Sequence, residues 1–398
     1  MVKSIIKVLS GLLITAVVIA SLYIGVTVPG GISGFWTMIT AVSGLNQSAD
    51  TVNNSAFSLP AGFEVDIVAE DLGYARFILV TDNNDLIVSI ADIGQILLLQ
   101  DSDGNGTTET HRILIEGLNG PQGLAFDGDW LYFSESDKVS RVLFDHSSAT
   151  IVGEIEVLIS DLPYALIHRA KIIGISPDRK LHIGVGSPCN VCEPEDPRYA
   201  AMLRAELDGS NPQILATGLR NTVGFDWAPW SGELYATSNS RDLLGDDFPP
   251  DDLNLIVEGG FYGWPYYHGD NVPDPEFGDK RPELAAVAIP PAHKFRPHNA
   301  PLGIHFVEEY EDMPEYLDRS ALVALHGSWN RSTLDGYKVV SLHWDSGGNI
   351  TRRDFLSGFI TADGVLGRPV AIAQDQQGRF YITDDLGGRI YRVQYRLQ

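Results

Sequence analysis

Several loops of this chain carry polar side chains that a plain connection between strands does not need. Histidine, arginine and asparagine side chains come just before strand-like segments, at His168, Arg169, Arg220 and Asn221. Acidic residues gather instead in a single loop, residues 239–254 (NSRDLLGDDFPPDDLN). Guanidinium and amide groups bind anions, and an imidazole accepts a proton near neutral pH. These residue types therefore favour an anionic ligand over a metal ion held by carboxylates from several loops.

The segments that must position these loops follow one repeated pattern. Each copy has an apolar strand with period-2 alternation, a turn rich in Gly, Asp and Asn, and a second apolar strand that ends in a small residue; a further strand follows. The copies cover residues 75–101, 123–145, 172–187 (followed by 202–207), 222–240, 300–328 and 369–395. Their spacing is near that of a propeller blade.

We therefore predict an all-β protein, a six-bladed β-propeller of four-stranded blades over residues 59–398, preceded by one N-terminal transmembrane helix. The 40 Gly and 22 Pro suit short strands and turns. One domain then replaces the two or three that a length of 398 residues alone suggests. Beyond the N-terminus no segment has a convincing helical period, which disfavours TIM-barrel and doubly wound folds. Loops between the blades should converge on one end of the channel, where they can meet a small ligand.

The N-terminal segment predicts a membrane anchor. Residues 8–28 contain no charge and follow Lys3 and Lys7, and about 20 apolar residues suffice to span a bilayer. A cleaved signal usually has a shorter apolar region, so an uncleaved anchor is favoured and secretion after cleavage is the alternative. The lysines hold the N-terminus in the cytoplasm and place the rest on the periplasmic side. The predicted organisation is 1–29 anchor or signal, 30–58 linker and 59–398 propeller.

Charge and cysteine content narrow the partners and the compartment. The 28 Lys plus Arg against 52 Asp plus Glu give a net charge of -24, which repels nucleic acid and anionic lipid, so any membrane contact must be hydrophobic. The only cysteines are Cys189 and Cys192, in PCNVC, and two thiolates make a poor structural metal site. In an exported protein they predict a structural disulfide rather than a redox-active pair.

The motifs along the chain resemble a known family. The strings GLRNTVGFDW, GDDFPPDDLN, EGGFYGWP, VPDPEFGD, APLGIHF, LHGSWNRS and GRPVAIAQD occur in this order between residues 59 and 398. They resemble the sorbosone dehydrogenase branch of the quinoprotein sugar dehydrogenases, a family that includes soluble glucose dehydrogenase and pyranose dehydrogenases. The resemblance implies a six-bladed propeller with pyrroloquinoline quinone (PQQ) over the channel and a calcium ion at the quinone.

The same resemblance implies roles for individual residues. His168 matches the general base that takes a hydroxyl proton as hydride leaves carbon. Arg220 matches the arginine that stabilises negative charge on the reduced quinone oxygen. The implied cofactor-binding set is Arg220, Asn221, Lys171, Trp329 and Arg331, and the backbone carbonyls of Ser240 and Arg241 would bind the calcium. The implied partners are a sugar or aldehyde substrate and an external electron acceptor, either a quinone or a cytochrome.

This chain departs from the family pattern near two of these motifs. Leu166 and Ile167 stand where two glycines usually precede the histidine, and Lys171 replaces an arginine. The first blade reads Ser89-Ile90-Ala91 where the family has Ser-Glu-Arg, so one cationic contact with the cofactor is expected to be missing; Gln122 also replaces a common histidine. A pocket tailored to another substrate and a weakened quinone site both explain these changes.

A second calcium site is a separate hypothesis, in the loop DSDGNGTTE of residues 101–109. Asp101, Asp103, Asn105 and the Thr107 carbonyl match the oxygen spacing of a calcium-binding loop. Position 12 is Arg112, however, where an EF-hand has a bidentate glutamate. The alternative is an ordinary Asp/Gly-rich turn between strands, and an ion bound there would be structural.

Three functions remain open from the sequence. The favoured one is an exported PQQ-dependent dehydrogenase that oxidises a sugar or a sugar-derived aldehyde. A calcium-dependent propeller lactonase is the second, but it needs channel-facing carboxylates from several blades, and here the acids cluster in one loop. The third is a non-catalytic carbohydrate-binding propeller, in which Ile167 and Ala170 bury His168 as a packing residue.

Overall fold

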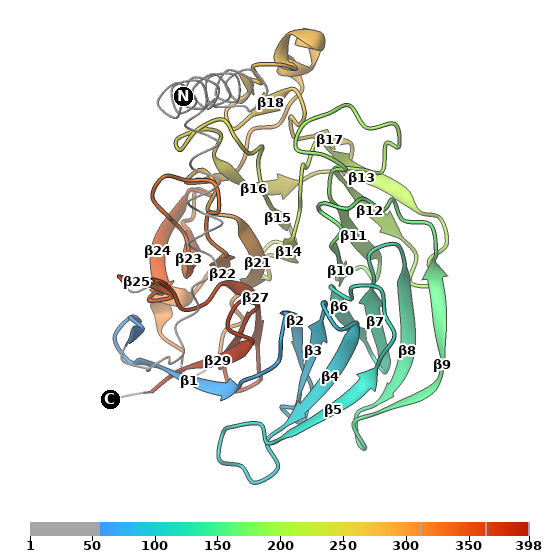
Figure 1. Ribbon diagram of the computed structural model, residues 1–398, viewed down its shortest axis with the longest axis vertical. Helices are drawn as coiled ribbons and strands as arrows, with labels where there is room; N and C mark the ends of the chain where they lie inside the picture. The colour runs from blue at the N-terminus through green and yellow to red at the C-terminus, as the bar shows by residue number, and fades with distance from the viewer. Residues whose placement is uncertain (1–55, 311–312, 363, 397–398) are drawn as a thin grey trace, which may run out of the picture.

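A computed structural model describes residues 56–310, 313–362 and 364–396 of the chain. Six four-stranded antiparallel blades stand around a common centre (Figure 1). Blade 1 contains β2 (Ala75–Val80), β3 (Leu86–Ile90), β4 (Gln95–Gln100) and β5 (Thr110–Ile115). Blade 2 contains β6 (Leu124–Asp127), β7 (Trp130–Ser134), β8 (Val139–Asp145) and β9 (Thr150–Ile159). Blade 3 contains β10 (Lys171–Ile175), β11 (Leu181–Val185), β12 (Ala201–Ala205) and β13 (Gln213–Thr217), and β17 (Gly260–Phe261) pairs in parallel with β13.

The remaining three blades complete the ring. Blade 4 contains β14 (Gly224–Trp227), β15 (Leu234–Ser238), β16 (Asp251–Ile256) and β20 (His293–Phe295). Blade 5 contains β21 (Pro301–Phe306), β22 (Ser320–Leu325), β23 (Lys338–Trp344) and β24 (Ile350–Leu356). Blade 6 contains β27 (Pro369–Gln374), β28 (Phe380–Asp384), β29 (Arg389–Tyr395) and β1 (Phe63–Ala69). Short elements outside the blades are β18 (Tyr267–His268), β19 (Val272–Pro273), β25 (Ile360–Thr361), β26 (Gly364–Val365), η2 (Gly278–Lys280), η3 (Pro282–Ala286) and η4 (Glu315–Leu317).

The ring is closed by the first strand of the described chain. β1 pairs antiparallel with β29, from Phe63 opposite Tyr395 to Ala69 opposite Ile390, so the outer strand of blade 6 comes from the other end of the sequence. Figure 1 shows this blue strand beside the red ones. Closure in this way joins the first and last blades through backbone hydrogen bonds and leaves only short, protected edges, as propellers do.

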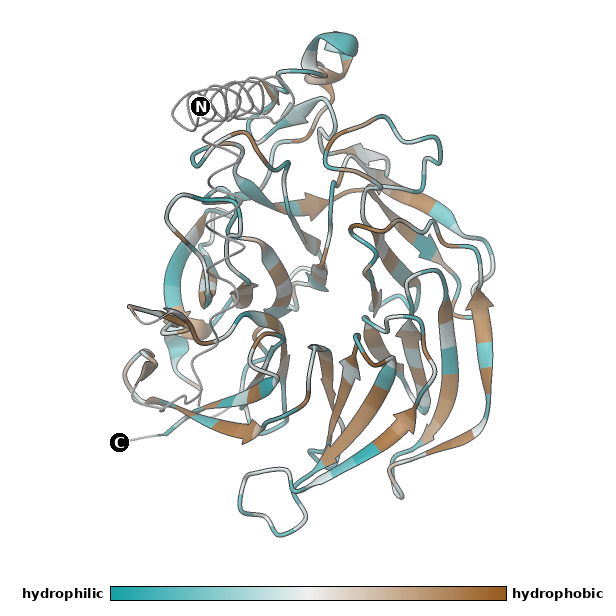
Figure 2. Ribbon diagram, in the orientation of Figure 1, coloured by the Kyte–Doolittle hydropathy of each residue, from teal (hydrophilic) through white to brown (hydrophobic). Residues whose placement is uncertain are grey.

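Hydrophobic residues run along the strands of the blades (Figure 2), and their side chains hold neighbouring blades together. Between blades 2 and 3 the buried cluster includes Tyr132 and Ile183, and between blades 4 and 5 it includes Tyr235 and Val323. The inner strands come so close that a Cβ on Gly224 would collide with the carbonyl oxygen of Leu302 in the next blade. The alternating strands seen in the sequence therefore bury one blade face on the next.

The structure confirms the six-bladed propeller of four-stranded blades. It differs from the sequence prediction in blade 4, where the loop predicted over 239–254 ends at Pro250 because Asp251–Ile256 form β16. Leu253 and Ile256 are buried in that strand, and their burial outweighs the two acids, Asp251 and Asp252, with which it begins.

The predicted anchor of residues 8–28 lies outside the described residues. Within the part of the chain that the structure describes, no helix is long and apolar enough to cross a membrane.

Candidate active site

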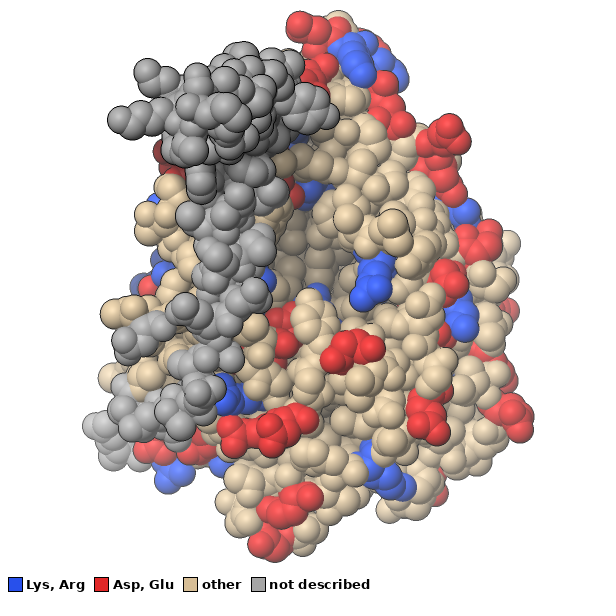
Figure 3. All heavy atoms as spheres, viewed as in Figure 1, with Lys and Arg blue, Asp and Glu red and all other residues tan. Residues whose placement is uncertain are grey.

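The segments that enter the six inner strands surround one cavity of about 390 Å³. Figure 3 shows one face of the molecule hollowed near its centre, with acidic side chains spread over the surface around the hollow. Loops after β15 and β22 also reach the cavity, so the predicted convergence of inter-blade loops is present. Its polar lining consists of Tyr74, Arg76, Gln122, His168, Arg169, Arg220, Asn221, Asn239, Ser240, Asp242, Asp251, His298, His326, Trp329, Asn330 and Arg368.

His168 enters this cavity in a defined tautomer. Its Nδ1 lies 3.1 Å from the carbonyl oxygen and 3.0 Å from the hydroxyl of Ser187, and that hydroxyl donates to the Cys189 carbonyl at 2.7 Å. A carbonyl oxygen only accepts, and the Ser187 proton is already used, so Nδ1 must carry the hydrogen. Nε2, with its lone pair, is then the free ring nitrogen. Ile167 beside it is 45% exposed and does not line the cavity.

Burial first, and then the charge of Arg220, lower the pKa of His168 to about 4. In the cofactor-free protein we therefore expect the imidazole to titrate near pH 4, whereas an unperturbed histidine has a pKa of about 6.5. The neutral form, which alone accepts a proton, then persists from neutral pH down to about pH 5 and is lost as the pH falls through 4. A histidine-labelled NMR titration, with the signal assigned by its loss in His168→Asn, measures this pKa. A midpoint at 6 or above would contradict it.

Arg220 is fixed by hydrogen bonds from all five of its N–H groups. Nε donates to the Asn190 carbonyl at 2.9 Å, and Nη1 donates to the carbonyls of Asn239 at 3.1 Å and Ser240 at 2.6 Å. Nη2 donates to the Asn190 side chain at 2.9 Å and to the Asp242 carboxylate at 2.8 Å. The guanidinium therefore ties its own segment to two loops at the cavity wall, the one with Asn190 and the one with residues 239–242.

Gly186 lets His168 and Asn221 approach each other. A Cβ at this position would lie 2.6 Å from the Cβ of His168 and 2.7 Å from Oδ1 of Asn221. Asn221 Oδ1 is buried and has no hydrogen-bond partner among the described residues. A buried polar atom without a partner is costly, so this amide oxygen indicates a ligand or a water in the cavity.

Arg76, His326 and Arg368 line another part of the cavity. The sequence had not predicted a role for any of these three residues. Arg76 pairs with the buried Asp385 at 2.5 Å and donates to Gln122 at 3.1 Å. Nε2 of His326 contacts the same carboxylate at 2.9 Å. Burial alone would raise the pKa of Asp385, but His326 and Arg76 hold it far below its usual value. Arg368 adds a cation, donating to the carbonyls of His326 at 3.1 Å and Gly327 at 2.7 Å.

Arg76 supplies a cation in blade 1, where the sequence led us to expect one missing. It lies in the register shift between Ala75 and Ile78 of β2, and such a bulge re-aims side chains. Ser89, of the altered Ser89-Ile90-Ala91 string, donates instead to the Gln122 carbonyl at 2.8 Å. The blade-1 position and Gln122 are thus parts of one arrangement that holds Arg76.

The proposed calcium loop is at the cavity wall, but only one of its two residues lines the cavity. Ser240 does, and its backbone N–H donates to Asp251 at 2.8 Å. Arg241 does not: its side chain is fully buried against Asp274, with Nη1 2.6 Å from a carboxylate oxygen. Oxygen donors near Ser240 include Asn239 Oδ1, which is buried without a partner among the described residues. Oxygen atoms of this kind suit calcium.

The other residues of the implied cofactor set are divided. Trp329 lines the cavity. Arg331 does not, because its guanidinium donates to the carbonyls of Asp246 and, at 3.2 Å, Pro297. Lys171 does not either: it is buried, donates to the Arg169 carbonyl at 3.2 Å, and has its pKa lowered to about 8 by that burial. The structure thus brings together His168, Arg220, Asn221, Ser240 and Trp329.

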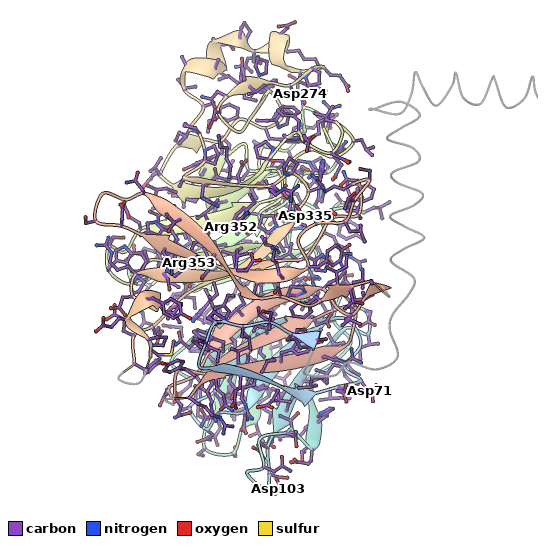
Figure 4. All side chains as sticks on the ribbon, turned by 90° about the vertical axis from the view of Figure 1, so that its left-hand side faces the viewer. Asp71, Asp103, Asp274, Asp335, Arg352 and Arg353 are labelled. Carbon is purple, nitrogen blue, oxygen red and sulfur yellow. A yellow bond between two sulfur atoms is a disulfide. The ribbon has the colours of Figure 1, made fainter. Side chains whose placement is uncertain are left out.

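Two sequence-predicted features lie in loops that do not line the cavity. Cys189 and Cys192 form a disulfide with 6.2 Å between their Cα atoms. The Asp101–Glu109 loop protrudes from the outer part of blade 1 (Figure 1), and Asp103 lies at the opposite end of the molecule from Asp274 (Figure 4). Ligand oxygens of Asp101, Asp103 and Glu109 lie within 4.8 Å of one another, and all three are exposed. Asn105 Oδ1 accepts the Thr107 N–H at 2.8 Å.

Comparison with known proteins identifies the family. The chain matches the family model described as TrAA12-like over residues 57–250 and 273–396. The chain belongs to the TrAA12-like family. An uncharacterized protein of Borreliella burgdorferi is 32% identical over 382 residues, covering 90% of this chain and 96% of that protein. Quinoprotein glucose dehydrogenase B of Acinetobacter calcoaceticus is 23% identical over 262 residues, and the match spans about half of each chain (52% and 53%).

Solved structures share the fold of this TrAA12-like chain. The holo form of the pyranose dehydrogenase PQQ domain from Coprinopsis cinerea has a TM-score of 0.73 and 20% identity, covering 88% of this chain and 98% of its own. The calcium structure of the Trichoderma reesei family AA12 protein has a TM-score of 0.74 and 21% identity, covering 88% of this chain and 100% of its own. The resemblance to the PQQ-dependent sugar dehydrogenases predicted from the motifs is thereby confirmed.

Proposed function

We propose that this protein is a PQQ-dependent dehydrogenase that oxidises a sugar or a sugar-derived aldehyde. The observation that carries the proposal is that His168 and Arg220 line the same cavity. Nε2 of His168 is unprotonated there, and hydrogen bonds fix the guanidinium of Arg220. Proteins of similar fold include sugar dehydrogenases with PQQ, such as the aldose sugar dehydrogenase of Streptomyces coelicolor.

The cavity suits an anion that carries carboxylates. Arginines 76, 169, 220 and 368 line it against two acids, Asp242 and Asp251. Asp242 is already paired with Arg220, and Asp385 is paired with Arg76. Arg169 and Arg368 form no ion pair with the described residues, so their charges remain available to an anion. The excess positive charge fits the PQQ tricarboxylate, Trp329 offers a flat apolar surface for its rings, and the unpartnered Asn221 oxygen adds a polar contact. Asn239 Oδ1, which has no partner among the described residues, would be an oxygen ligand for a calcium ion beside it, whereas the Ser240 carbonyl already accepts from Arg220 at 2.6 Å.

The residues divide the work of an alcohol or aldehyde-hydrate oxidation. When bound, PQQ supplies the two-electron acceptor for the hydride that leaves the substrate carbon. His168 takes the hydroxyl proton at Nε2, while Ser187 holds the opposite nitrogen and fixes the ring. Arg220 stabilises negative charge that develops in the cavity, and its five hydrogen bonds fix the guanidinium before the reaction.

This arrangement favours a dehydrogenase over a calcium-dependent lactonase. A lactonase needs carboxylates free to hold a catalytic ion, whereas Asp251 accepts the backbone N–H groups of Ser240 at 2.8 Å and Ala300 at 2.9 Å. Asp242 is likewise engaged by Arg220 and by Asn330 at 3.0 Å. The cavity acids therefore organise loops.

The location and the electron acceptor are part of the proposal. The uncharged run of residues 8–28 after two lysines supports a membrane-anchored protein with its propeller on the periplasmic side. Electrons from the reduced cofactor would then pass to an external quinone or cytochrome. The glucose- and sorbosone-like range of substrates rests on the family motifs alone.

Titration of the purified full-length chain with PQQ and calcium tests the proposal. We expect one PQQ per chain, a shifted quinone absorbance, and reduction of the bound quinone when an aldose, ketose or aldehyde is added. Heat-denatured protein serves as the control for nonspecific adsorption. Absence of saturable binding would remove the cofactor, and binding without reduction by any of these substrates would favour a carbohydrate-binding propeller.

A further inference from the structure

A short loop that joins β11 to β12 lies behind both principal side chains of the cavity. Residues 187–192 form no strand or helix, and the Cys189–Cys192 disulfide closes the loop. Both cysteines and the two residues between them are half-buried. With no ladder of backbone hydrogen bonds to fix this stretch, the covalent link is its main internal restraint.

The first half of the loop holds His168. The Cys189 carbonyl accepts the Ser187 hydroxyl proton at 2.7 Å, which turns the Ser187 oxygen into an acceptor for Nδ1 of His168. The Ser187 N–H in turn donates to the Arg220 carbonyl at 2.7 Å. Both acceptors for Nδ1, the carbonyl and the hydroxyl oxygen, belong to Ser187, the first residue of this loop, so the loop sets which nitrogen of His168 carries the proton.

The second half of the loop holds Arg220 through Asn190. The Asn190 carbonyl accepts from Nε of Arg220 at 2.9 Å and from the Trp264 indole at 3.3 Å. Its side-chain oxygen accepts from Nη2 of Arg220 and from the Asp242 N–H, both at 2.9 Å. Its side-chain N–H donates to the Asp242 carbonyl at 3.1 Å. Asn190 therefore joins the disulfide loop to Arg220 and to the segment that carries Ser240.

We propose that the Cys189–Cys192 loop is the element that positions His168 and Arg220, with Asn190 as its positioning residue. Neither cysteine lines the cavity, so the loop acts through these two side chains. Reduction by a dithiol gives two thiols: the disulfide takes up two electrons and two protons from the reductant, which becomes a cyclic disulfide. The oxidised loop presents His168 in one tautomer and Arg220 in one orientation, and the reduced loop does not.

Three variants and one reduction test this proposal on the full-length chain. Cys189→Ser/Cys192→Ser removes the link, and Asn190→Ala removes the side-chain contact with Arg220. Asn190→Asp replaces the donor toward the Asp242 carbonyl with an oxygen. Asn83→Ala is the matched control, because Asn83 also holds a distant loop, through the His146 carbonyl at 2.8 Å, and does not line the cavity. Dithiothreitol treatment of folded wild type supplies the same comparison without a substitution.

The first readout is independent of the cofactor. Ring ¹⁵N shifts of His168 should show a single Nδ1–H tautomer in wild type and in Asn83→Ala. The double serine variant and reduced wild type should show a mixture of tautomers. Dithiothreitol should change nothing further in the double serine variant.

The second readout rests on the proposed function, since it measures PQQ affinity with calcium present. Losing the Asn190 side chain removes a hydrogen bond to a charged group, so Asn190→Ala should raise the Kd about tenfold. The disulfide variants should raise it at least as much. Asn190→Asp, which keeps the oxygen that accepts from Arg220, should raise it less, and Asn83→Ala should leave it unchanged. Unchanged tautomer and unchanged affinity in both the double serine variant and the reduced wild type would overturn the positioning role. If wild type binds no PQQ, the cofactor assignment fails, while the tautomer measurement still decides the role of the loop.

Discussion

Replacing His168 with asparagine is expected to lower turnover by at least about 10²-fold, the low end for general-base catalysis, while PQQ binding stays near that of wild type. Asparagine cannot accept a proton at neutral pH, but its amide can still donate to the Ser187 carbonyl. It also suits the backbone, since His168 has a φ of 50°, in the left-handed region that asparagine tolerates better than most residues. The loss should therefore appear in kcat rather than in the amount of folded, loaded protein.

Stopped-flow reduction of the bound quinone by a saturating sugar measures this effect directly. His305→Asn is the matched control, because His305 lies in β21, contacts Gln374 at 3.3 Å and does not line the cavity. The control should reduce the quinone at the wild-type rate. If His168→Asn stays within a few-fold of wild type, another group accepts the proton, and His326 beside Asp385 is the next histidine to replace.

The propeller could be predicted from the sequence repeats because the strands of most blades follow one another along one short stretch of the chain. These strands alternate apolar and polar residues, and the inter-blade loops then meet by geometry, which brought His168, Arg220, Asn221, Ser240 and Trp329 to one cavity. The closure of blade 6 by β1 could not be inferred in this way. It pairs Phe63 with Tyr395, two residues at opposite ends of the propeller sequence, and no local pattern encodes that register.

Side-chain direction accounts for the residues that the sequence placed differently. Lys171 is the first residue of β10 and lies on the same face of the strand as Ile173, which packs between blades 2 and 3, so the lysine points between blades rather than into the cavity. Arg76 shows the reverse case, since only the irregular pairing at the start of β2 places it at the cavity. His326 and Arg368 belong to the recognised strings LHGSWNRS and GRPVAIAQD. The contact of His326 with Asp385 and that of Arg368 with the Gly327 carbonyl, however, form only when blades 5 and 6 lie side by side. Arg331, in the first of those strings, is turned toward the Asp246 loop.

Replacing Arg220 with alanine is expected to weaken PQQ binding by roughly one to two orders of magnitude, since a hydrogen bond or pair involving a charged group is worth about 1.5–3 kcal/mol. Two effects contribute to this loss. The cavity loses a positive charge, and the carbonyls of Asn190, Asn239 and Ser240 lose their donor. The second effect frees the loop that carries Asn239 and Ser240 from the guanidinium that anchors it.

A lysine at the same position separates these two effects. The substituted side chain would keep the charge, but an ammonium has three donors and no planar fork, so Arg220→Lys cannot restore the five hydrogen bonds of the guanidinium. Because we attribute most of the role of Arg220 to holding the loops, Arg220→Lys should bind PQQ nearly as weakly as Arg220→Ala. Arg204→Ala, which removes a half-buried arginine that pairs with the exposed Glu258 at 3.1 Å and does not line the cavity, should bind like wild type. Recovery of wild-type affinity in Arg220→Lys would assign the effect to charge alone.

The pH dependence of the same variants gives an independent check. The charge of Arg220 contributes to the low pKa of His168, second to burial. Arg220→Ala should therefore raise that pKa, and the acid limb of turnover should move to higher pH, because the neutral imidazole is then lost earlier as the pH falls. Arg220→Lys keeps a positive charge near His168, so its turnover should fall on the acid side at nearly the same pH as that of wild type. The lysine variant should thus resemble alanine in affinity and wild type in pH dependence, a combination that follows only if Arg220 acts on the loops through its hydrogen bonds and on His168 through its charge.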